Sequence, residues 1–251
     1  MTESNRSVKA VPPHPTLRSY YDTNADRQKF VNDLFDRTSQ HYDWADRVLS
    51  LGSGDRYRGH VLRQAGLKAG MRVLDVATGT GAVAAVARQI VTESGFVVGV
   101  DPSAGMLSVA RQKVDARFVQ AMGEAIALKG DSFDLLTMGF ALRHVADLGA
   151  AFHEYRRVLK PGGQIAIMEL SVPSSKLGAG LLRHYMGKIV PLIVRLGTRS
   201  RDTERLMRYY WETTATCTPP ATIIEVLRDV GFRDVRNEAQ FGILSVYRAV
   251  K

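Results

Sequence analysis

Apolar residues along the chain fall into two alternating patterns. Short runs such as residues 71–77 (MRVLDVA) and 96–101 (FVVGVD) are almost wholly apolar, whereas the segments between such runs repeat apolar residues at helical spacing. Short apolar runs are typical of buried strands, and helices of this length connect parallel strands. The predicted strands cover residues 71–77, 96–101, 116–121, 132–142, 164–170, 232–240 and 242–250. The predicted helices cover residues 26–46, 56–66, 82–91, 103–114, 148–160 and 220–231.

This order of elements predicts an α/β fold. Strands that alternate with helices form a Rossmann-like, doubly wound sheet, here of seven mostly parallel strands. The last two predicted strands are joined by too few residues for a helical crossover, so an antiparallel closing strand is predicted. Ser103 is expected to cap the helix that follows it, and Pro161, Gly162 and Gly163 are expected to stop the helix before them.

The same pattern predicts the domain organisation. Residues 1–25 are polar and proline-bearing, which indicates a loose N-terminal arm. Residues 26–251 are predicted to form a single domain, with residues 26–66 as an N-terminal helical cap. Residues 172–215 interrupt the alternation between the fifth strand and the last helix, and we interpret them as an insert.

Composition narrows the class of protein. Of the 251 residues, 45% are hydrophobic and 24% are charged, as in an ordinary folded domain with a full core. The single cysteine, Cys217, excludes an intramolecular disulfide, and no cysteine and histidine residues have the spacing of a zinc site, so no metal is predicted. The N-terminus lacks the apolar segment of a secretory signal, and no run reaches the roughly 18 apolar residues of a transmembrane helix. We therefore expect a cytoplasmic protein.

The net charge of +9 is concentrated in one segment. Between residues 176 and 208, lysines and arginines far outnumber Asp202 and Glu204 and are interleaved with leucine, isoleucine and methionine. This mixture favours an interfacial or lid helix over a nucleic-acid groove, with a solvated helix face as the alternative. We therefore expect contact with the inner face of a membrane through residues 176–208, and no nucleic-acid partner.

A candidate ligand site follows the first strand, in VLDVATGTGAVA (73–84). Gly79 and Gly81 remove side-chain bulk there, so a ligand can reach backbone N–H groups at the start of the next helix. Asp75 is expected to accept a hydrogen bond from a cationic or amino group of that ligand. Such a loop serves dinucleotides as well as S-adenosylmethionine, so it leaves the cofactor open. The candidate cofactor contacts in this stretch are Asp75, Ala77, Gly79, Thr80 and Gly81.

Asp101 ends the second strand and is expected to accept hydrogen bonds from the ribose hydroxyls of an adenosine. Pro102 follows it, and Met106 lies in the next helix, so both are candidate adenosine contacts. Downstream, FDLLTMGFALRHV (133–145) ends the fourth strand and is followed by a helix and RVLKPGG (157–163). This order resembles the Class I S-adenosylmethionine-dependent methyltransferases, and it favours that cofactor over a dinucleotide.

Several motifs together resemble the ubiquinone/menaquinone biosynthesis C-methyltransferase family over roughly residues 30–250. The resemblance implies transfer of a methyl group from S-adenosylmethionine to a ring carbon of a polyprenylated phenol or hydroquinone. It also implies a hydrophobic aromatic acceptor, an acceptor pocket built by the insert at residues 172–215, and a homodimer. The motifs are HYDWADRVLSLG (41–52), VLDVATGTG (73–81), GVDPSAGML (99–107), GFALRHV (139–145), VLKPGGQIAIMELSVP (158–173) and DVGFRDV (229–235).

Carried over position by position, the family's cofactor contacts fall on Thr80, Asp101, Met122, Gly123 and Gly139. The family usually has Asn-Ala at the third and fourth of these positions and serine at the last, so this chain departs there. Backbone contacts to the adenine survive such changes, whereas side-chain contacts do not. A helix near the N-terminus commonly closes over this cofactor, and Tyr42 is the candidate contact from it.

The family's Leu-Arg-Asn signature falls on Leu142, Arg143 and His144, with histidine in place of asparagine. Methylation of a phenol's ring carbon requires the hydroxyl to lose its proton, or nearly so. We expect Arg143 to stabilise the developing phenolate and His144 to act as the base. The structural alternatives are an ion pair of Arg143 with Asp147 or Glu169, and a loop role for His144.

Further departures leave the acceptor open. Gly54 and Asp55 stand where the family has His-Arg. An O- or N-methyltransferase of a small aromatic metabolite is therefore the alternative function. An RNA methyltransferase and a non-catalytic cofactor-binding partner are less favoured, because a nucleic-acid motif is lacking and the glycine loop is intact.

Overall fold

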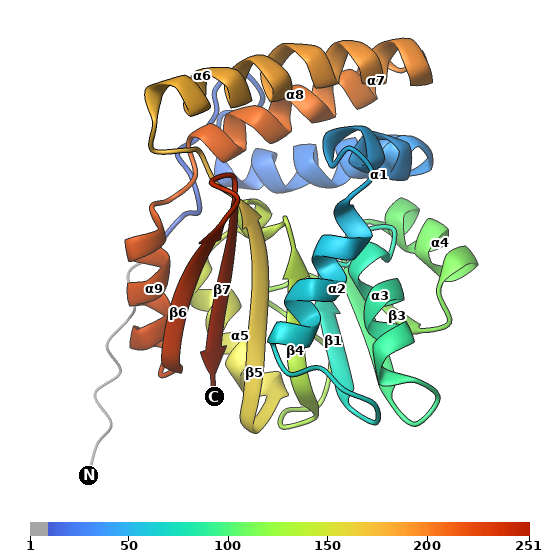
Figure 1. Ribbon diagram of the computed structural model, residues 1–251, viewed down its shortest axis with the longest axis vertical. Coiled ribbons are helices and arrows are strands. Elements are labelled where there is room, and N and C mark those ends of the chain that lie inside the picture. Colours follow the sequence, from blue (N-terminus) through green and yellow to red (C-terminus); the bar gives the residue numbers. More distant parts are fainter. Residues whose placement is uncertain (1–9) are drawn as a thin grey trace.

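The computed structural model describes residues 10–251, which form an α/β sandwich around a single sheet (Figure 1). The seven-stranded sheet has the order β3-β2-β1-β4-β5-β7-β6. Strand β7 runs antiparallel to both of its neighbours, and the other pairs are parallel. The predicted fold is therefore confirmed. The strands are β1 Arg72–Val76, β2 Phe96–Asp101, β3 Arg117–Gln120, β4 Phe133–Gly139, β5 Leu159–Leu170, β6 Arg233–Gln240 and β7 Leu244–Val250.

Helices cover both faces of the sheet because successive strand residues point to opposite sides. Leu74 and Leu136 pack in one core with α5 and α9, whereas Val73 and Leu135 pack in another with α2 and α3. These helices, together with α4 beside β3, are α2 Gly54–Gln64, α3 Ala82–Val91, α4 Ala104–Lys113, α5 Leu148–Val158 and α9 Pro220–Asp229.

Two predicted helix ends can be compared with the structure. Ser103 caps α4 as predicted, because its side chain accepts a hydrogen bond from the Met106 N–H. The prediction that Pro161, Gly162 and Gly163 stop α5 is wrong. That helix ends at Val158, and the three residues lie inside β5, beside the point where its register with β4 shifts.

A further layer of helices lies beyond the carboxyl ends of the strands (Figure 1). The predicted helical cap and the predicted insert pack together there, around Leu34, Val194, Leu206 and Tyr209. No helix within residues 10–251 has the length and apolar character needed to cross a bilayer. The layer consists of α1 Asn24–Leu49, α6 Lys176–His184, the π-helical turn η2 Tyr185–Ile189, α7 Val190–Thr198 and α8 Arg201–Ala215.

Residues 10–23 lie against the body of the domain, in contrast to the loose arm predicted over residues 1–25. The Val11 carbonyl accepts a hydrogen bond from the Leu148 N–H, and the Pro13 carbonyl accepts one from the Thr218 N–H. His14 and Tyr21 are buried. Residues 1–9 of that prediction lie outside the described residues.

Candidate active site

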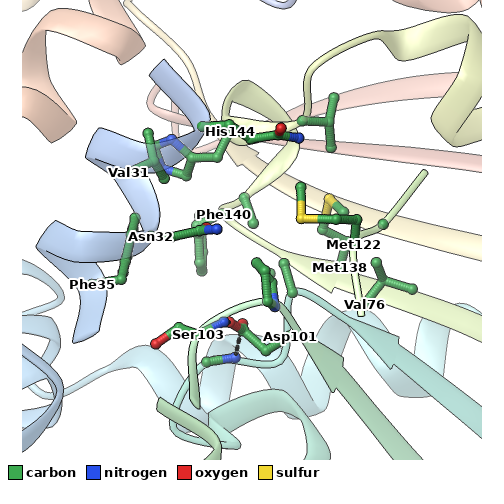
Figure 2. A pocket seen from close by; sticks show the side chains of 18 of the residues that line it. Val31, Asn32, Phe35, Val76, Asp101, Ser103, Met122, Met138, Phe140 and His144 are labelled. Atoms are coloured by element: carbon green, nitrogen blue, oxygen red, sulfur yellow. Dashed lines mark hydrogen bonds between the residues drawn. The ribbon is translucent and has the colours of Figure 1, made fainter. Parts of the chain in front are cut away.

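A cavity, here called the central cavity, lies between α1 and the carboxyl ends of β1, β2 and β4 (Figure 2). Strand β1 lies between β2 and β4, so the connections leave it in opposite directions, and open α/β sheets bind their ligands at such a point. Figure 2 shows Asp101 and His144 at opposite ends, with Met122 and Met138 on one side and α1 on another. The predicted cofactor contacts that line the central cavity are Tyr42, Ala77, Gly79, Asp101, Pro102, Met122, Gly123 and Gly139.

Asp101 is held at the end of β2 by the loops on either side of it. Its Oδ2 accepts a hydrogen bond from the Gly79 N–H at 2.8 Å, and its Oδ1 accepts one from the Ser103 N–H at 2.9 Å. Burial raises the pKa of this carboxyl to about 6, although the two hydrogen bonds oppose that shift. A carboxylate has four acceptor sites, so Asp101 keeps capacity for the two hydroxyls of a ribose.

Two glycines shape the cavity for different reasons. Gly79 has a φ of +55°, and a Cβ added there would meet nothing within 4 Å, so the bare backbone borders open space. At Gly139 a Cβ would lie 2.7 Å from the Val83 Cγ2. The chain's departure from serine at this position therefore matches the packing of α3 against β4.

Asp75 does not face the ligand side, so the prediction for it is wrong. The residue is 0% exposed, and its two oxygens accept hydrogen bonds from the hydroxyls of Thr78, at 2.6 Å, and Thr137, at 2.8 Å. Burial raises its pKa to about 6. Asp75 thus ties the glycine loop to β4, because alternation along β1 directs its side chain to the same face of the sheet as Val73, which α2 and α3 cover.

Three other predicted contacts also lie outside the central cavity. The Thr80 hydroxyl donates to the Asp43 carboxylate of α1 at 2.5 Å, and Thr80 and Gly81 line a polar cavity on the other side of the glycine loop. Met106 is buried in the core.

Carboxylates of α1 bind the loops beneath it: Asp43 accepts from Thr80, and Asp36 accepts hydrogen bonds from the Ser103 hydroxyl and the Gly105 N–H. Two carboxylates therefore hold α1 over the site.

His144 lies at the end of the central cavity opposite Asp101 (Figure 2). Its ring stacks on Tyr209 at a centroid distance of 5.5 Å and meets the ring of Phe35 edge-on at 5.4 Å. Both ring nitrogens are buried and have no hydrogen-bond partner within residues 10–251. Burial, together with the positive charge of Arg143, lowers the pKa of His144 well below its usual value, so the imidazole is neutral.

Arg143 lies outside the central cavity, so the predicted contact between Arg143 and the acceptor is wrong. The side chain is 0% exposed and is absent from the lining of the central cavity. Its Nη1 lies 2.7 Å from a Glu169 carboxylate oxygen, and its guanidinium lies 4.3 Å from the centroid of the Tyr210 ring. Of the two predicted ion-pair alternatives, the one with Glu169 is correct. The 3₁₀ turn Leu142–His144 directs the two neighbouring side chains to different sides.

Several residues of the cavity wall were missed by sequence reasoning. Gln28, Val31, Asn32 and Phe35 lie on the same face of α1 as Tyr42, at spacings of three, four and seven residues from Gln28. That helical spacing is a signal that could have found them. The remaining missed residues are Val76, Ser103, Glu124, Met138, Phe140, Ala141, Val145 and Tyr210.

A second cavity, here called the apolar cavity, adjoins the first. Its volume is about 440 Å³, and Tyr42, Phe140 and Tyr210 line both cavities. The hydroxyls of the two tyrosines lie 2.5 Å apart in the shared wall. The apolar cavity is within the size range of small-molecule sites. Its other apolar and aromatic lining residues are Leu49, Leu51, Tyr57, Leu170, Leu182, Tyr185, Met186, Ile243 and Leu244.

Comparison with known proteins gives one family. Residues 22–251 match the model of the ubiE/COQ5 methyltransferase family. A protein of Shewanella frigidimarina named ubiquinone/menaquinone biosynthesis C-methyltransferase UbiE is 31% identical over 95% of this chain and 98% of its own. A protein of the same name from Xanthomonas oryzae pv. oryzae is 34% identical over 82% of this chain and 83% of its own.

Solved structures share the fold at low identity. A SAM-dependent methyltransferase of Aquifex aeolicus is 21% identical, with a TM-score of 0.58 over 82% of this chain and 97% of that chain. Phosphoethanolamine N-methyltransferase 2 of Haemonchus contortus, in complex with S-adenosyl-L-methionine, is 19% identical, with a TM-score of 0.58 over 86% of this chain and 57% of that chain. At these identities the likeness supports the fold alone.

Proposed function

Because this chain belongs to the ubiE/COQ5 methyltransferase family, and is thus an S-adenosylmethionine-dependent methyltransferase, we propose that it methylates a ring carbon of a polyprenyl quinone precursor. The observation that carries the choice of acceptor is the apolar cavity of about 440 Å³ against the central cavity. A large apolar space beside the cofactor suits a ring that carries a long hydrocarbon tail. The names of the UbiE relatives support the same substrate class.

The residues that line the central cavity have the chemistry that the cofactor requires. Asp101 offers carboxylate oxygens for the ribose hydroxyls, and the bare backbone at Gly79 borders open space beside it. S-adenosylmethionine, when bound, supplies a methyl group already activated on a sulfonium. The chain's own contribution is therefore to align the acceptor, exclude water and control the acceptor's proton.

The acceptor ring is assigned to the wall shared by the two cavities. Phe140 and Tyr210 offer aromatic faces there, and the ring centroids of His144 and Tyr210 lie 5.7 Å apart. A ring against these faces places its hydroxyl toward His144 and its tail in the apolar cavity. Burial, together with the positive charge near His144, disfavours a further proton on the imidazole, so we assign its N–H as a hydrogen-bond donor to the acceptor oxygen.

The reaction is tested with labelled S-adenosylmethionine and four acceptors: a demethylmenaquinol, its tail-less naphthoquinol, a small catechol and RNA. We expect the label in the apolar extract of the first, with both hydroxyls of the ring retained. A product methylated on oxygen would favour the alternative function on small aromatic metabolites, and label in RNA would overturn the proposal.

Cofactor affinity is expected to fall with pH through the titration of Asp101. Below about pH 6 this carboxyl is protonated and loses acceptor capacity, so the Kd for S-adenosylhomocysteine should rise by up to roughly tenfold per pH unit. Asp101→Asn should weaken binding about 10- to 100-fold at pH 8 and remove the pH dependence. Isothermal titration calorimetry measures both. Asp75→Asn is the control, because Asp75 titrates in the same range without facing the cavity, and loss of the pH dependence in that variant would contradict the assignment.

We further propose that the outer face of α6, η2 and α7 binds an anionic bilayer. Exposed apolar side chains run along it, among them Leu177 at 76%, Leu181 at 64% and Leu196 at 70% exposure. Residues 176–201 contain no aspartate or glutamate. An apolar stripe flanked only by cations complements anionic headgroups and their acyl boundary. The exposed cations between residues 176 and 199 are Lys176, Arg183, Lys188, Arg195 and Arg199, of which Arg195 pairs with Glu204 of α8.

Sedimentation with vesicles tests this face. The triple variant Arg183→Gln, Lys188→Gln and Arg199→Gln should bind phosphatidylglycerol vesicles about 100-fold more weakly, at about 1 kcal/mol for each cation. The matched control changes Lys68, Lys129 and Arg228 to glutamine. These exposed residues precede β1, β4 and β6 and therefore lie at the edge of the sheet opposite the helical layer. Equal partitioning of both triple variants would contradict the proposal. A second outcome would also contradict the proposal: the wild-type protein is a dimer, and the first triple variant dissociates it without a change in vesicle binding. The face would then join two copies of the chain.

A further inference from the structure

Arg27 of α1 is a buried cation without a carboxylate partner. The residue is 3% exposed, and its guanidinium takes part in none of the ion pairs within residues 10–251. Burying a charge without a counter-charge is costly in free energy. The position of Arg27 therefore calls for a compensating role, either in the fold or at the site.

The contacts of Arg27 connect it to His144. Its Nη2 donates to the carbonyl oxygen of Arg143 at 3.2 Å and to that of Val145 at 2.6 Å. These two carbonyls belong to the residues on either side of His144. The guanidinium thus fixes the backbone that carries the imidazole, while both imidazole nitrogens remain unpartnered at the wall of the central cavity.

The ionisable surroundings leave the charge of Arg27 largely uncompensated. The charge of Arg143 is balanced by Glu169 at 2.7 Å. The carboxylate of Glu124 also lines the central cavity. Because Glu124 is partly exposed, solvent screens its charge more strongly than it screens the charge of the buried Arg27. Burial and nearby cations lower the pKa of His14 to about 4 and also lower the pKa of His144 well below its usual value, so both are neutral. The groups near Arg27 are His14, Tyr21, Arg143, His144 and Tyr209, and the carboxylate of Glu212 on α8 also lies near Tyr21.

We propose that Arg27 is a positioning residue for the acceptor: it holds His144 against the acceptor hydroxyl, and its buried charge favours the ionised form of that hydroxyl. The inference rests on the proposed function, since it needs a phenolic acceptor at His144. An opposite charge within about 4–6 Å of an ionisable group shifts its pKa by about one to three units. Arg27 is not itself in the lining of the central cavity, so we expect a shift toward the lower end of this range. The ring carbon of a phenolate is the better nucleophile, so this shift assists transfer to carbon. The hydroxyl proton passes to solvent when the phenolate forms, and the proton of the methylated ring carbon passes to solvent when the ring becomes aromatic again.

A coloured phenol tests the inference without turnover. The anion of 4-nitrophenol is yellow, so its pKa when bound can be read by absorbance in the presence of S-adenosylhomocysteine. We expect Arg27→Gln to raise the pKa of the bound probe by about one to two units and Arg27→Lys to restore most of the difference. Arg37→Gln is the matched control, because Arg37 is an exposed arginine of α1 paired with Asp202. A pKa equal in wild type and Arg27→Gln, or failure of wild type to bind the probe, would overturn the inference.

Steady-state kinetics separate this role from a purely structural one. The acid limb of the kcat profile should move to higher pH in Arg27→Gln by the same one to two units, and Arg27→Lys should return it. A loss of kcat that is equal at every pH, together with a lower Tm, would show that Arg27 only supports the fold. If no quinol is methylated but the probe's pKa still depends on Arg27, the quinol acceptor fails, and the role of Arg27 applies to another phenolic acceptor. If quinols are methylated and Arg27→Gln moves neither pKa, only this inference fails.

Discussion

Replacing Arg143 with methionine is expected to lower the free energy of unfolding by about 3–5 kcal/mol, because it leaves a buried carboxylate without its partner. Glu169 is 2% exposed, and its nearest cation is the Arg143 guanidinium at 2.7 Å. The carboxylate also accepts a hydrogen bond from the Leu142 N–H at 2.8 Å, so it cannot turn toward solvent without breaking the loop that leads to His144. Urea unfolding followed by circular dichroism measures the loss.

The double variant Arg143→Met with Glu169→Gln is expected to recover much of this loss. Glutamine keeps an oxygen for the Leu142 N–H and carries no charge. Arg37→Met is the control, because the Arg37–Asp202 pair is about half exposed on both sides and should contribute less than about 1 kcal/mol. A loss below about 1 kcal/mol for Arg143→Met, or no recovery in the double variant, would show that this pair does not stabilise the fold as described.

Replacing His144 with phenylalanine is expected to lower kcat by roughly 100- to 1000-fold, whereas asparagine should retain most of the activity. Phenylalanine preserves stacking on Tyr209 but removes the N–H that we assign to the acceptor oxygen. Loss of one preorganised donor at a developing oxyanion has an effect of this size. Asparagine supplies a donor N–H but cannot accept a proton as a base does.

Steady-state kinetics with a quinol acceptor measure the two His144 variants, and calorimetry with S-adenosylhomocysteine provides the control. Cofactor affinity should stay within about twofold of wild type in both, because Asp101 and Gly79 lie at the opposite end of the central cavity. Equal and severe loss of kcat in both variants would restore the base role predicted from sequence. Activity of the phenylalanine variant close to wild type would remove His144 from the reaction.

The sequence by itself determined the elements and their order, because the signals for them are local. Apolar runs and helical spacing are read within about ten residues, and β2 and α3 begin and end where the pattern predicts. The placement of Asp101 at the cofactor side also followed from sequence, because strand ends of a parallel sheet converge on one edge.

Only the tertiary structure decided which way individual side chains face and what they meet. Asp75 bonds to Thr137, on another strand, and Arg143 selects Glu169 on β5 over Asp147 nearby in sequence. Arg27 reaches the carbonyls beside His144 from a helix more than a hundred residues away in the chain. Such pairings depend on distances between elements that the fold brings together, and sequence spacing carries no record of those distances.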